Sequence, residues 1–345
     1  MKTLLAVDGG NSKTDVVLAD ELGHVLSRVR GEGCSPDALE PTGSLGVLLP
    51  LIANARSIAG LADDHTFNAA AFFLAGVDRP EQESLMVELL QPLALADELI
   101  VANDTFAVLQ AGSANGWGVA VVCGAGLNAV GVTPEGRVGR YQALGELSGD
   151  WGGGFSVGLS ALGAAIRGDD GRGPVTVLTP RISEHFHATG PQEIAAAIHE
   201  QRLDAQVLVD CAPLVFACAA EGDEVSRQIV DRVGDEVAVM AVAMLRRIAL
   251  DNCQAEVVLG GGLMQSGYQP LVSRTEQLIH DRDPSVVVRV LDVPPVIGCV
   301  RETLRMCSLT SADIESALVR LAKELAGSES ARDSRVSASP VRLRR

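Results

Sequence analysis

The chain has 345 residues, a formal net charge of −16 at pH 7, and 47% hydrophobic residues with 36 glycines. This length suits two domains with cores of their own, and the composition is typical of a compact α/β enzyme. The negative charge argues against nucleic acid and anionic membranes as partners, since both require a basic protein surface. No apolar run reaches the ~20 residues that span a bilayer, and the N-terminal run is too short for a secretory signal, so we expect a cytoplasmic protein.

The first third of the chain alternates predicted strands with predicted helices. Continuous apolar runs predict buried strands and their hairpin partners at 3–8, 14–20, 24–30, 69–76 and 98–104. Helices are expected at 43–61, from Pro80 onward, and at 105–112. The first and last of these strands end in carboxylates, Asp8 and Asp104.

Near residue 117 the pattern of the N-terminus starts again. Residues 117–145, like residues 4–33, predict three strands joined by two turns, and a glycine-bearing turn follows the first strand in both. The distance between the two copies is too long for a solenoid repeat. The pattern therefore predicts a duplicated domain.

The second half continues with helices and two further strands. Helices are expected at 152–167, 191–199, 205–219, 223–250, 268–281, from Pro294 onward and at 310–326. Strands are expected at 256–262 and 285–293, and residues 168–190 as a less regular segment. Residues 328–345 are rich in Ser and Arg with few apolar residues, which predicts a disordered tail.

The segment DGGNSKTD, residues 8–15, ends like a phosphate-binding loop. The Walker pattern does not fit, because Lys13 follows Ser12 rather than a glycine and a strand rather than a helix comes next. GAGLNAVG has the wrong spacing for a dinucleotide fingerprint, and GGGFSVG follows no strand. A glycine-rich hairpin turn that offers backbone N–H groups to phosphates remains.

Such a turn would combine backbone donors with a metal-binding carboxylate. Asp8 would hold a hydrated Mg²⁺, which prefers a carboxylate together with phosphates. The candidate nucleotide-binding residues are Gly9, Gly10, Asn11, Ser12 and Lys13, with Gly124, Ala125 and Gly126 at the matching turn of the second copy. The alternative is two ordinary tight hairpin turns.

Six short motifs, taken in order, resemble the BadF/BadG/BcrA/BcrD ATPase family, whose best understood sugar-kinase members are the N-acetylglucosamine kinases. They are DGGNSKT (8–14), LAGVD (74–78), AND (102–104), GAGLN (124–128), GDWGGG (149–154) and LGGG (259–262). The resemblance covers roughly residues 3–308 and implies an α/β fold of two duplicated actin-like, ribonuclease H-like lobes around a nucleotide cleft. The lobes are expected at 1–113 and 114–308, the second with a helical insertion, and a helix within 309–327 could complete the first.

The resemblance also implies roles for single residues. It implies that Asp104 is the base that takes the proton of the sugar hydroxyl. It also implies that adenine approaches the backbone at Gly260, Gly261 and Gly262. It assigns sugar contacts to Gly76, Asp78, Asn128, Gly145 and Asp150. The alternatives are helix caps for Asp78, Asp104 and Asp150, a turn residue for Asn128, and a strand-to-helix turn for the three glycines.

The chain departs from the family pattern in two places. The SGTGS motif of the kinases reads CGAGL here, so Ala125 replaces a threonine hydroxyl. The loop that carries an early sugar-binding Asn in the family reads GEGCSPDAL, with Ser35 or Asp37 near that place.

The expected activity is ATP-dependent and Mg²⁺-dependent phosphorylation of an amino sugar, N-acetylglucosamine or a related hexosamine, at the 6-hydroxyl. A homodimer is expected. One rival is an iron–sulfur ATPase that activates a CoA-ester reductase or dehydratase. The other is a non-catalytic sugar sensor, for which an added DNA-binding segment would be expected before the first strand.

Cysteine and histidine positions bear on these rivals. The seven cysteines form no CxxC pair and most lie among apolar neighbours, so buried structural thiols are expected. His185 and His187 lack a third ligand at zinc-like spacing, so a structural role is expected for both.

Overall fold

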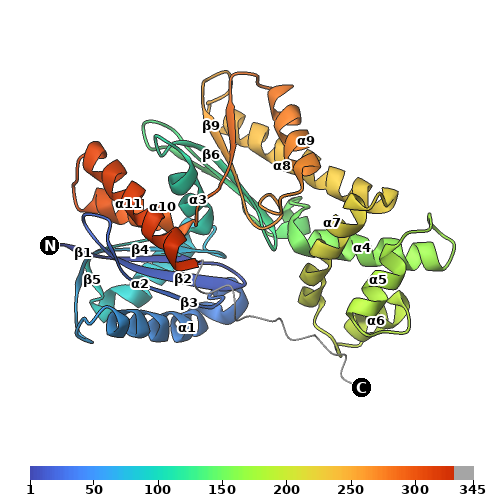
Figure 1. The fold of residues 1–345 in the computed structure, drawn as a ribbon, viewed down its shortest axis with the longest axis horizontal. Helices are drawn as coiled ribbons and strands as arrows, with labels where there is room; N and C mark the ends of the chain where they lie inside the picture. Colours follow the sequence, from blue (N-terminus) through green and yellow to red (C-terminus); the bar gives the residue numbers. More distant parts are fainter. Residues whose placement is uncertain (330–345) are drawn as a thin grey trace.

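The computed structural model describes residues 1–329, which form two five-stranded sheets with helices packed on their faces (Figure 1). The strands of the first sheet are β1 (Thr3–Gly9), β2 (Lys13–Asp20), β3 (Val25–Glu32), β4 (Phe67–Leu74) and β5 (Ala96–Asn103). Their order is β3-β2-β1-β4-β5. β1 pairs antiparallel with β2 and parallel with β4, and β4 is parallel to β5. The carboxyl ends of β1, β4 and β5 therefore meet at one edge of the sheet.

The second sheet repeats this topology. Its strands are β6 (Gly118–Cys123), β7 (Leu127–Val132), β8 (Val138–Arg140), β9 (Glu256–Gly260) and β10 (Val287–Val290), in the order β8-β7-β6-β9-β10. β6 pairs antiparallel with β7 and parallel with β9, as β1 does with β2 and β4. The fold is thus the predicted duplicated α/β arrangement.

Helices cover both sheets. In the first half they are α1 (Pro36–Ile58), α2 (Pro80–Leu90), a short 3₁₀ turn η1 (Gln91–Leu93) and α3 (Asp104–Gly112). In the second half η2 (Gly145–Ser148), α4 (Gly153–Asp169), α8 (Glu224–Arg247) and α9 (Gln269–His280) surround the sheet. α8 packs on β6, β7 and β8, and α3 packs against strands of both sheets. The core under α3 is continuous between the two halves.

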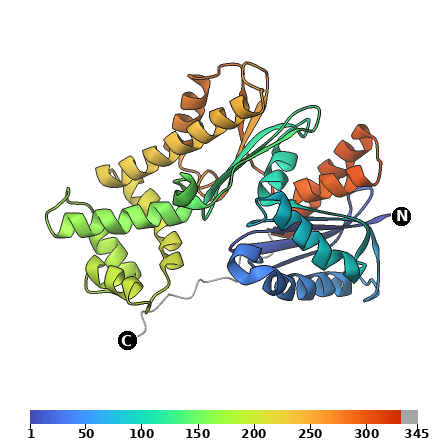
Figure 2. The ribbon, with the colours of Figure 1, turned by 180° about the vertical axis from the view of Figure 1, so that it is seen from behind.

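A helical insertion extends the second half away from the first sheet (Figure 2). It consists of α5 (Leu178–His185), α6 (Pro191–His199), η3 (Ala205–Cys211) and α7 (Ala212–Ala220), which pack around α4. The segment 168–190 was expected to be irregular, and the prediction missed α5. The expected helix at 205–219 begins as a 3₁₀ turn before it becomes α-helical.

The last two helices return to the first sheet, as Figures 1 and 2 both show. α10 (Val296–Met306) packs on β1, β4 and α3, and α11 (Ser311–Glu329) reaches β3. α11 covers most of the range 309–327 in which a helix was expected to complete the first lobe, and the bounds of the lobes stay predictions. α10, which the predicted boundary at residue 308 assigned to the second lobe, also lies on the first sheet.

The start of α1 and the end of α11 differ from their predictions. α1 begins at Pro36, before the expected residue 43, and bends at Glu40, whose φ is 59°. Pro41 follows this bend, and a residue before proline is disfavoured in the α conformation. α11 continues through Ser328 and Glu329, the first two residues of the expected tail, and 330–345 lie outside the described residues.

Within residues 1–329, no single helix is long and apolar enough to cross a membrane. One pair, Ala205–Ala220 with Glu224–Arg247, passes the same length and composition test together but is bent by 115°.

Candidate active site

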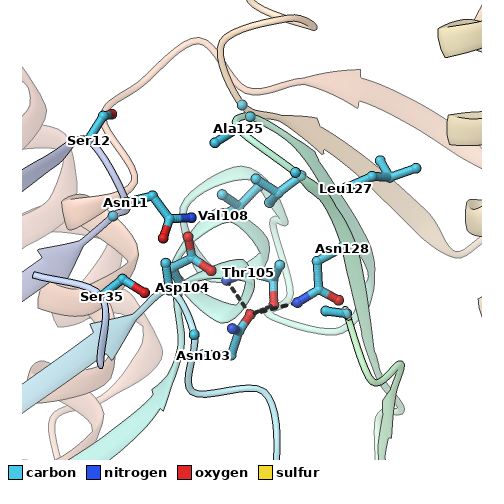
Figure 3. Close-up of a pocket in the computed structure, with 18 of the residues that line it drawn as sticks. Asn11, Ser12, Ser35, Asn103, Asp104, Thr105, Val108, Ala125, Leu127 and Asn128 are labelled. Atoms are coloured by element: carbon cyan, nitrogen blue, oxygen red, sulfur yellow. Dashed lines mark hydrogen bonds between the residues drawn. The ribbon is translucent and has the colours of Figure 1, made fainter. Parts of the chain in front are cut away.

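A cleft of about 330 Å³ opens between the two sheets. Both halves of the molecule line it: the β1–β2 turn and the ends of β4 and β5 on one side, the β6–β7 turn and the loop after β9 on the other. Figure 3 shows Asn11, Ser12 and Ser35 on the first side and Ala125, Leu127 and Asn128 on the second, with Asp104 between them. The duplicated topology brings the two glycine turns to face the same space.

The β1–β2 turn presents free backbone donors. Gly10 N donates to Lys13 O at 2.8 Å, which closes the turn. The N–H groups of Asn11 and Ser12 donate no hydrogen bond to any described residue. Asn11, Ser12 and Lys13 line the cleft, so the turn offers two amide donors and one ammonium group to an anionic ligand.

The β6–β7 turn is held by the start of α4. Gly154 N and Phe155 N donate to the carbonyl oxygens of Gly124 and Ala125 at 2.8 and 3.0 Å. Gly153, with φ +75°, makes this approach possible, since a Cβ there would lie 2.5 Å from Gly126 Cα. The N–H groups of Ala125 and Gly126 donate to nothing within residues 1–329 and so remain available to phosphate oxygens.

Of the three glycines at the end of β9, Gly261 serves close backbone packing. Gly261 has φ +88°, and a Cβ on it would lie 2.4 Å from the backbone of Cys123. Gly261 and Gly262 line the cleft, whereas Gly260 does not. A Cβ on Gly260 would lie 2.7 Å from Val108 Cγ1, so its lack of a side chain serves the packing of α3 on β9.

Asp104 is the first residue of α3 and lies on the floor of the cleft. It is not the helix cap, because Asn103 occupies that position and its Oδ1 accepts the Thr105 N–H at 3.0 Å. Burial raises the pKa of Asp104 to about 6, although the N–H groups of Thr105 and of Asp104 itself partly oppose the rise. A carboxylate with such a pKa is ionised near neutral pH and is basic enough to accept a proton.

Asp8, at the end of β1, has the chemistry of a metal ligand. Its carboxylate accepts no hydrogen bond from the described residues, and burial together with the charges of Asp104 and Asp15 raises its pKa to about 8. A cation beside it would offset that repulsion. Residues 1–329 contain no group of three or more His, Cys, Asp or Glu arranged to hold a metal ion. A single carboxylate facing phosphate-binding turns fits Mg²⁺, which keeps several waters and completes its shell with phosphates.

Asp78 joins the two halves next to the strand end that precedes Asp104. It accepts hydrogen bonds from Asn103 Nδ2 and Asn128 Nδ2, both at 2.8 Å, and Asn128 lies on β7 of the second sheet. Burial and the charges of Asp104 and Asp37 raise the pKa of Asp78 to about 7. The capping alternative for Asp78 is wrong, because Arg79 is the N-cap of α2.

A second contact joins the halves near the same place. Arg140 of β8 forms an ion pair with Glu83 of α2 at 2.6 Å, and both side chains are largely buried. The Arg140 guanidinium also lies 5.0 Å from the ring centroid of Phe106. Together with the Asp78–Asn128 bond, it holds the two walls of the cleft.

The cleft gathers most of the residues that the sequence nominated. All but three line it: Asp8, Gly10, Asn11, Ser12, Lys13, Gly76, Asp78, Asp104, Gly124, Ala125, Gly126, Asn128, Gly145, Gly261 and Gly262. The exceptions are Gly9, Gly260 and Asp150. Gly9 packs against Cys34 and Leu74.

Asp150 is buried beside the cleft rather than in its lining. Its carboxylate accepts a hydrogen bond from Ser148, and its N–H donates to Gly145 O at 2.9 Å. The capping alternative is also wrong for Asp150, since Gly152 is the N-cap of α4. Asp150 therefore braces the loop that carries Gly145.

Sequence reasoning missed two residues of the site. Thr105 and Asn103 both line the cleft, and they bond to each other through the Thr105 hydroxyl and Asn103 Oδ1. The signal was present, because an Asn before a predicted helix is a favoured N-cap.

Comparison with known proteins agrees with this architecture. A curated N-acetylmuramic acid/N-acetylglucosamine kinase from Clostridium acetobutylicum is 25% identical over 266 residues, covering 77% of this chain and 87% of the relative. An N-acetyl-D-glucosamine kinase from Dictyostelium discoideum is 26% identical over 278 residues, covering 76% of this chain and 86% of the relative.

Solved structures share the fold. A protein from Chromobacterium violaceum, described as an N-acetylglucosamine kinase, superposes with a TM-score of 0.70 at 22% identity, covering 89% of this chain and 99% of that chain. A Porphyromonas gingivalis protein described in the same way has a TM-score of 0.66 at 19% identity, and the match covers 88% of this chain and 99% of that chain. The sequence pattern of the BadF/BadG/BcrA/BcrD ATPase family matches residues 5–300, and the chain belongs to that family.

Proposed function

We propose that this protein is an ATP-dependent kinase that phosphorylates an amino sugar, N-acetylglucosamine or a related hexosamine, at its 6-hydroxyl. The observation that carries the proposal is the position of Asp104, a partly buried carboxylate on the floor of a cleft bounded by two turns with free N–H groups. The two curated relatives, both N-acetylglucosamine kinases by name, support the choice of substrate class.

In the proposed reaction the residues of this chain mainly position the reactants and neutralise the charge on the phosphates. The β1–β2 and β6–β7 turns would hold the phosphates of ATP by their backbone N–H groups, with Lys13 as an added cation. Asp104 would take the proton from the sugar hydroxyl as its oxygen attacks the γ-phosphorus, and ADP would leave. Asp8 would hold Mg²⁺, and the ion would supply charge neutralisation on the phosphates. Closure of the two halves would exclude water.

The sugar would occupy the side of the cleft lined by Gly76, Asn128 and Gly145. Asn128 donates to Asp78, and this bond fixes the direction of its amide. Asp150 would act indirectly by bracing the loop at Gly145.

Homodimerisation and a cytoplasmic location stay predictions.

The burial of the cysteines weighs against the iron–sulfur rival. Cys34, Cys123, Cys211, Cys218, Cys299 and Cys307 are buried, and Cys253 is exposed. The six buried cysteines are distributed over three separate core clusters, as expected of structural thiols. An interfacial cluster would require several accessible thiolates close together.

The test is a coupled ADP-release assay over hexoses, hexosamines, N-acetylhexosamines and N-acetylmuramic acid. We expect release that depends on an N-acetylated amino sugar and that the Asp104→Ala variant lacks. ATP hydrolysis indifferent to every sugar, or full activity of Asp104→Ala, would overturn the proposal.

A further inference from the structure

The loop between β8 and α4 supplies Ala143 and Gly145 to the lining of the cleft. Within the described chain, every hydrogen bond of residues 143–150 has its partner inside the same stretch. Ala143 has a φ of 53°, a strained conformation for a residue with a Cβ, which persists only where surrounding contacts hold it. The hydrogen bonds shape the loop but do not attach it to the rest of the second half, so other contacts must hold it in place.

Two arginines of α8 lie over aromatic rings at the two ends of this loop. Arg232 Cζ lies 3.8 Å from the centroid of the Trp151 ring, and Arg247 Cζ lies 5.8 Å from that of Tyr141. An aromatic face attracts a guanidinium within about 6 Å, and the attraction weakens with distance, so the Arg232 contact is the stronger. α8 packs on β6, β7, β8 and α4. The rings therefore attach the loop to a helix that is fixed on the second sheet.

Trp151 lies where the loop meets the start of α4. Its neighbour Asp150 donates its N–H to Gly145 O at 2.9 Å, whereas Gly154, three residues further on, donates to Gly124 O at 2.8 Å. The α4 side of Trp151 is thus held by backbone hydrogen bonds to the β6–β7 turn. The loop side has no such bond among residues 1–329 and depends on the ring, which is 8% exposed within the core of the second half.

The surroundings of Arg232 favour a role toward Trp151 over a role in stability. Arg232 lies outside the cleft lining, and its side chain is 53% exposed. Its ion pair with Glu236, one turn along α8, has an N–O distance of 3.6 Å, and exposed pairs of this kind contribute little to stability. The guanidinium is planar and stacks on aromatic faces more readily than the ammonium group of lysine. The position over Trp151 is therefore the feature that favours an arginine here.

We propose that Arg232 is a positioning residue for the reaction: by lying over Trp151, it holds residues 143–150 in the shape that presents Gly145 to the sugar. The inference rests on the proposed function and adds to it a residue outside the cleft. Arg247 supports the other end of the same loop through its weaker contact with Tyr141.

The first experiment compares Arg232→Ala with Arg227→Ala. Arg227 is an exposed arginine of the same helix that pairs with Glu224 at 2.6 Å and lies over no aromatic ring among residues 1–329. Arg232→Ala should raise KM for N-acetylglucosamine about two- to fivefold, with an unchanged KM for ATP. Arg227→Ala should leave both KM values unchanged.

Two further variants separate positioning from packing. Arg232→Lys, which keeps the positive charge, should have a KM for the sugar between those of wild type and Arg232→Ala. In a Trp151→Leu background, Arg232→Ala should cause no further rise in this KM, because the ring on which it acts is gone. Additive rises in KM would overturn the inference. A lower Tm with an unchanged KM for the sugar would also overturn it, since the contact would then serve stability alone.

Fluorescence tests the contact without any substrate. Trp117 and Trp151 are the two tryptophans of the sequence, so Trp117→Phe leaves Trp151 as the single emitter. In that background Arg232→Ala should increase the quenching of Trp151 by acrylamide, and Arg227→Ala should not. The same difference should appear in the wild-type background, over a constant contribution from Trp117. Equal quenching with and without the Arg232 side chain would show that the guanidinium does not cover the ring, and it would overturn the inference.

The kinetic outcomes distinguish the inference from the kinase proposal. An active Arg232→Ala variant with an unchanged KM for the sugar would overturn the inference and leave the kinase proposal standing. A rise in KM for ATP alone would overturn it in favour of a role at the β6–β7 turn. A wild-type enzyme that phosphorylates no sugar would overturn the kinase proposal and the inference together.

Discussion

The two glycine turns occupy equivalent places in the duplicated sheets, yet their chemistry differs. In the first hairpin, Asp8 lies one residue before Gly9, the last paired residue of β1. Val122 occupies the equivalent place in the second hairpin, one residue before Cys123 of β6. The first turn carries Asn11, Ser12 and Lys13, and the second carries Ala125 between two glycines. Both turns line the cleft, and both have N–H groups without a hydrogen-bond partner among residues 1–329. The backbone cradle is therefore repeated, whereas charge is confined to the first copy.

This difference says where each kind of mutation should act. In the first half, side chains at strand ends supply the carboxylates. In the second half, the backbone path fixed by Gly153 and Gly261 supplies the geometry. Side-chain changes should be most damaging in the first half, and added Cβ atoms most damaging in the second.

The largest effect is expected from Asp104→Asn, which keeps the shape of the side chain and removes the base. We expect kcat to fall by about 10²–10⁴-fold with little change in KM for ATP. Asp292→Asn, at the carboxylate that follows β10 in the second sheet, should leave kcat unchanged. Steady-state kinetics with N-acetylglucosamine measure both variants. Equal losses of kcat in the two variants would contradict the difference between the halves.

The next effect is expected from Asp8→Asn. Loss of a carboxylate beside the phosphate turns should raise the Mg²⁺ concentration needed for half-maximal activity about 10–100-fold. Val122→Ala, at the equivalent strand position, should leave that requirement unchanged. Activity titrated with Mg²⁺ at saturating ATP gives the comparison, and a Mg²⁺ curve unaffected by Asp8→Asn would contradict a metal-side role.

A backbone effect is expected from Gly153→Ala in the second half. The new Cβ would meet Gly126 at 2.5 Å at a positive φ, so the β6–β7 turn must move. We expect KM for ATP to rise on the order of tenfold, with a lower Tm. Gly10→Ala should do less, since a Cβ there would lie 3.1 Å from Lys13 O with no positive φ required. The opposite ranking would contradict the view that the second turn acts through its backbone.

The smallest effect concerns pH. The pKa of Asp104 is raised to about 6, and a general base acts in its ionised form. At saturating Mg²⁺, kcat should be constant between pH 7 and 8 and should fall below pH 6, so that it is roughly tenfold lower at pH 5. A kcat profile that stays flat down to pH 5 would show that the base is not this buried carboxylate.

The sequence predicted the duplicated sheets because each central strand is a continuous apolar run bounded by a glycine turn. It also predicted Asp8 and Asp104 at one edge, since parallel strands end together. The return of α10 to β1 was not predictable, because that packing joins segments almost 300 residues apart. The Asp78–Asn128 bond between the halves also depends on a tertiary contact that local patterns do not encode. The kink at Glu40 had a local signal in Pro41 that the prediction did not use.

The most direct test is to identify the product by mass spectrometry and NMR after incubation with ATP, Mg²⁺ and N-acetylglucosamine. The account predicts ADP and a sugar monophosphate bearing the phosphate at the 6-hydroxyl, formed by the wild type and not by Asp104→Asn. ADP and free phosphate with unmodified sugar, at a rate independent of the sugar, would contradict it.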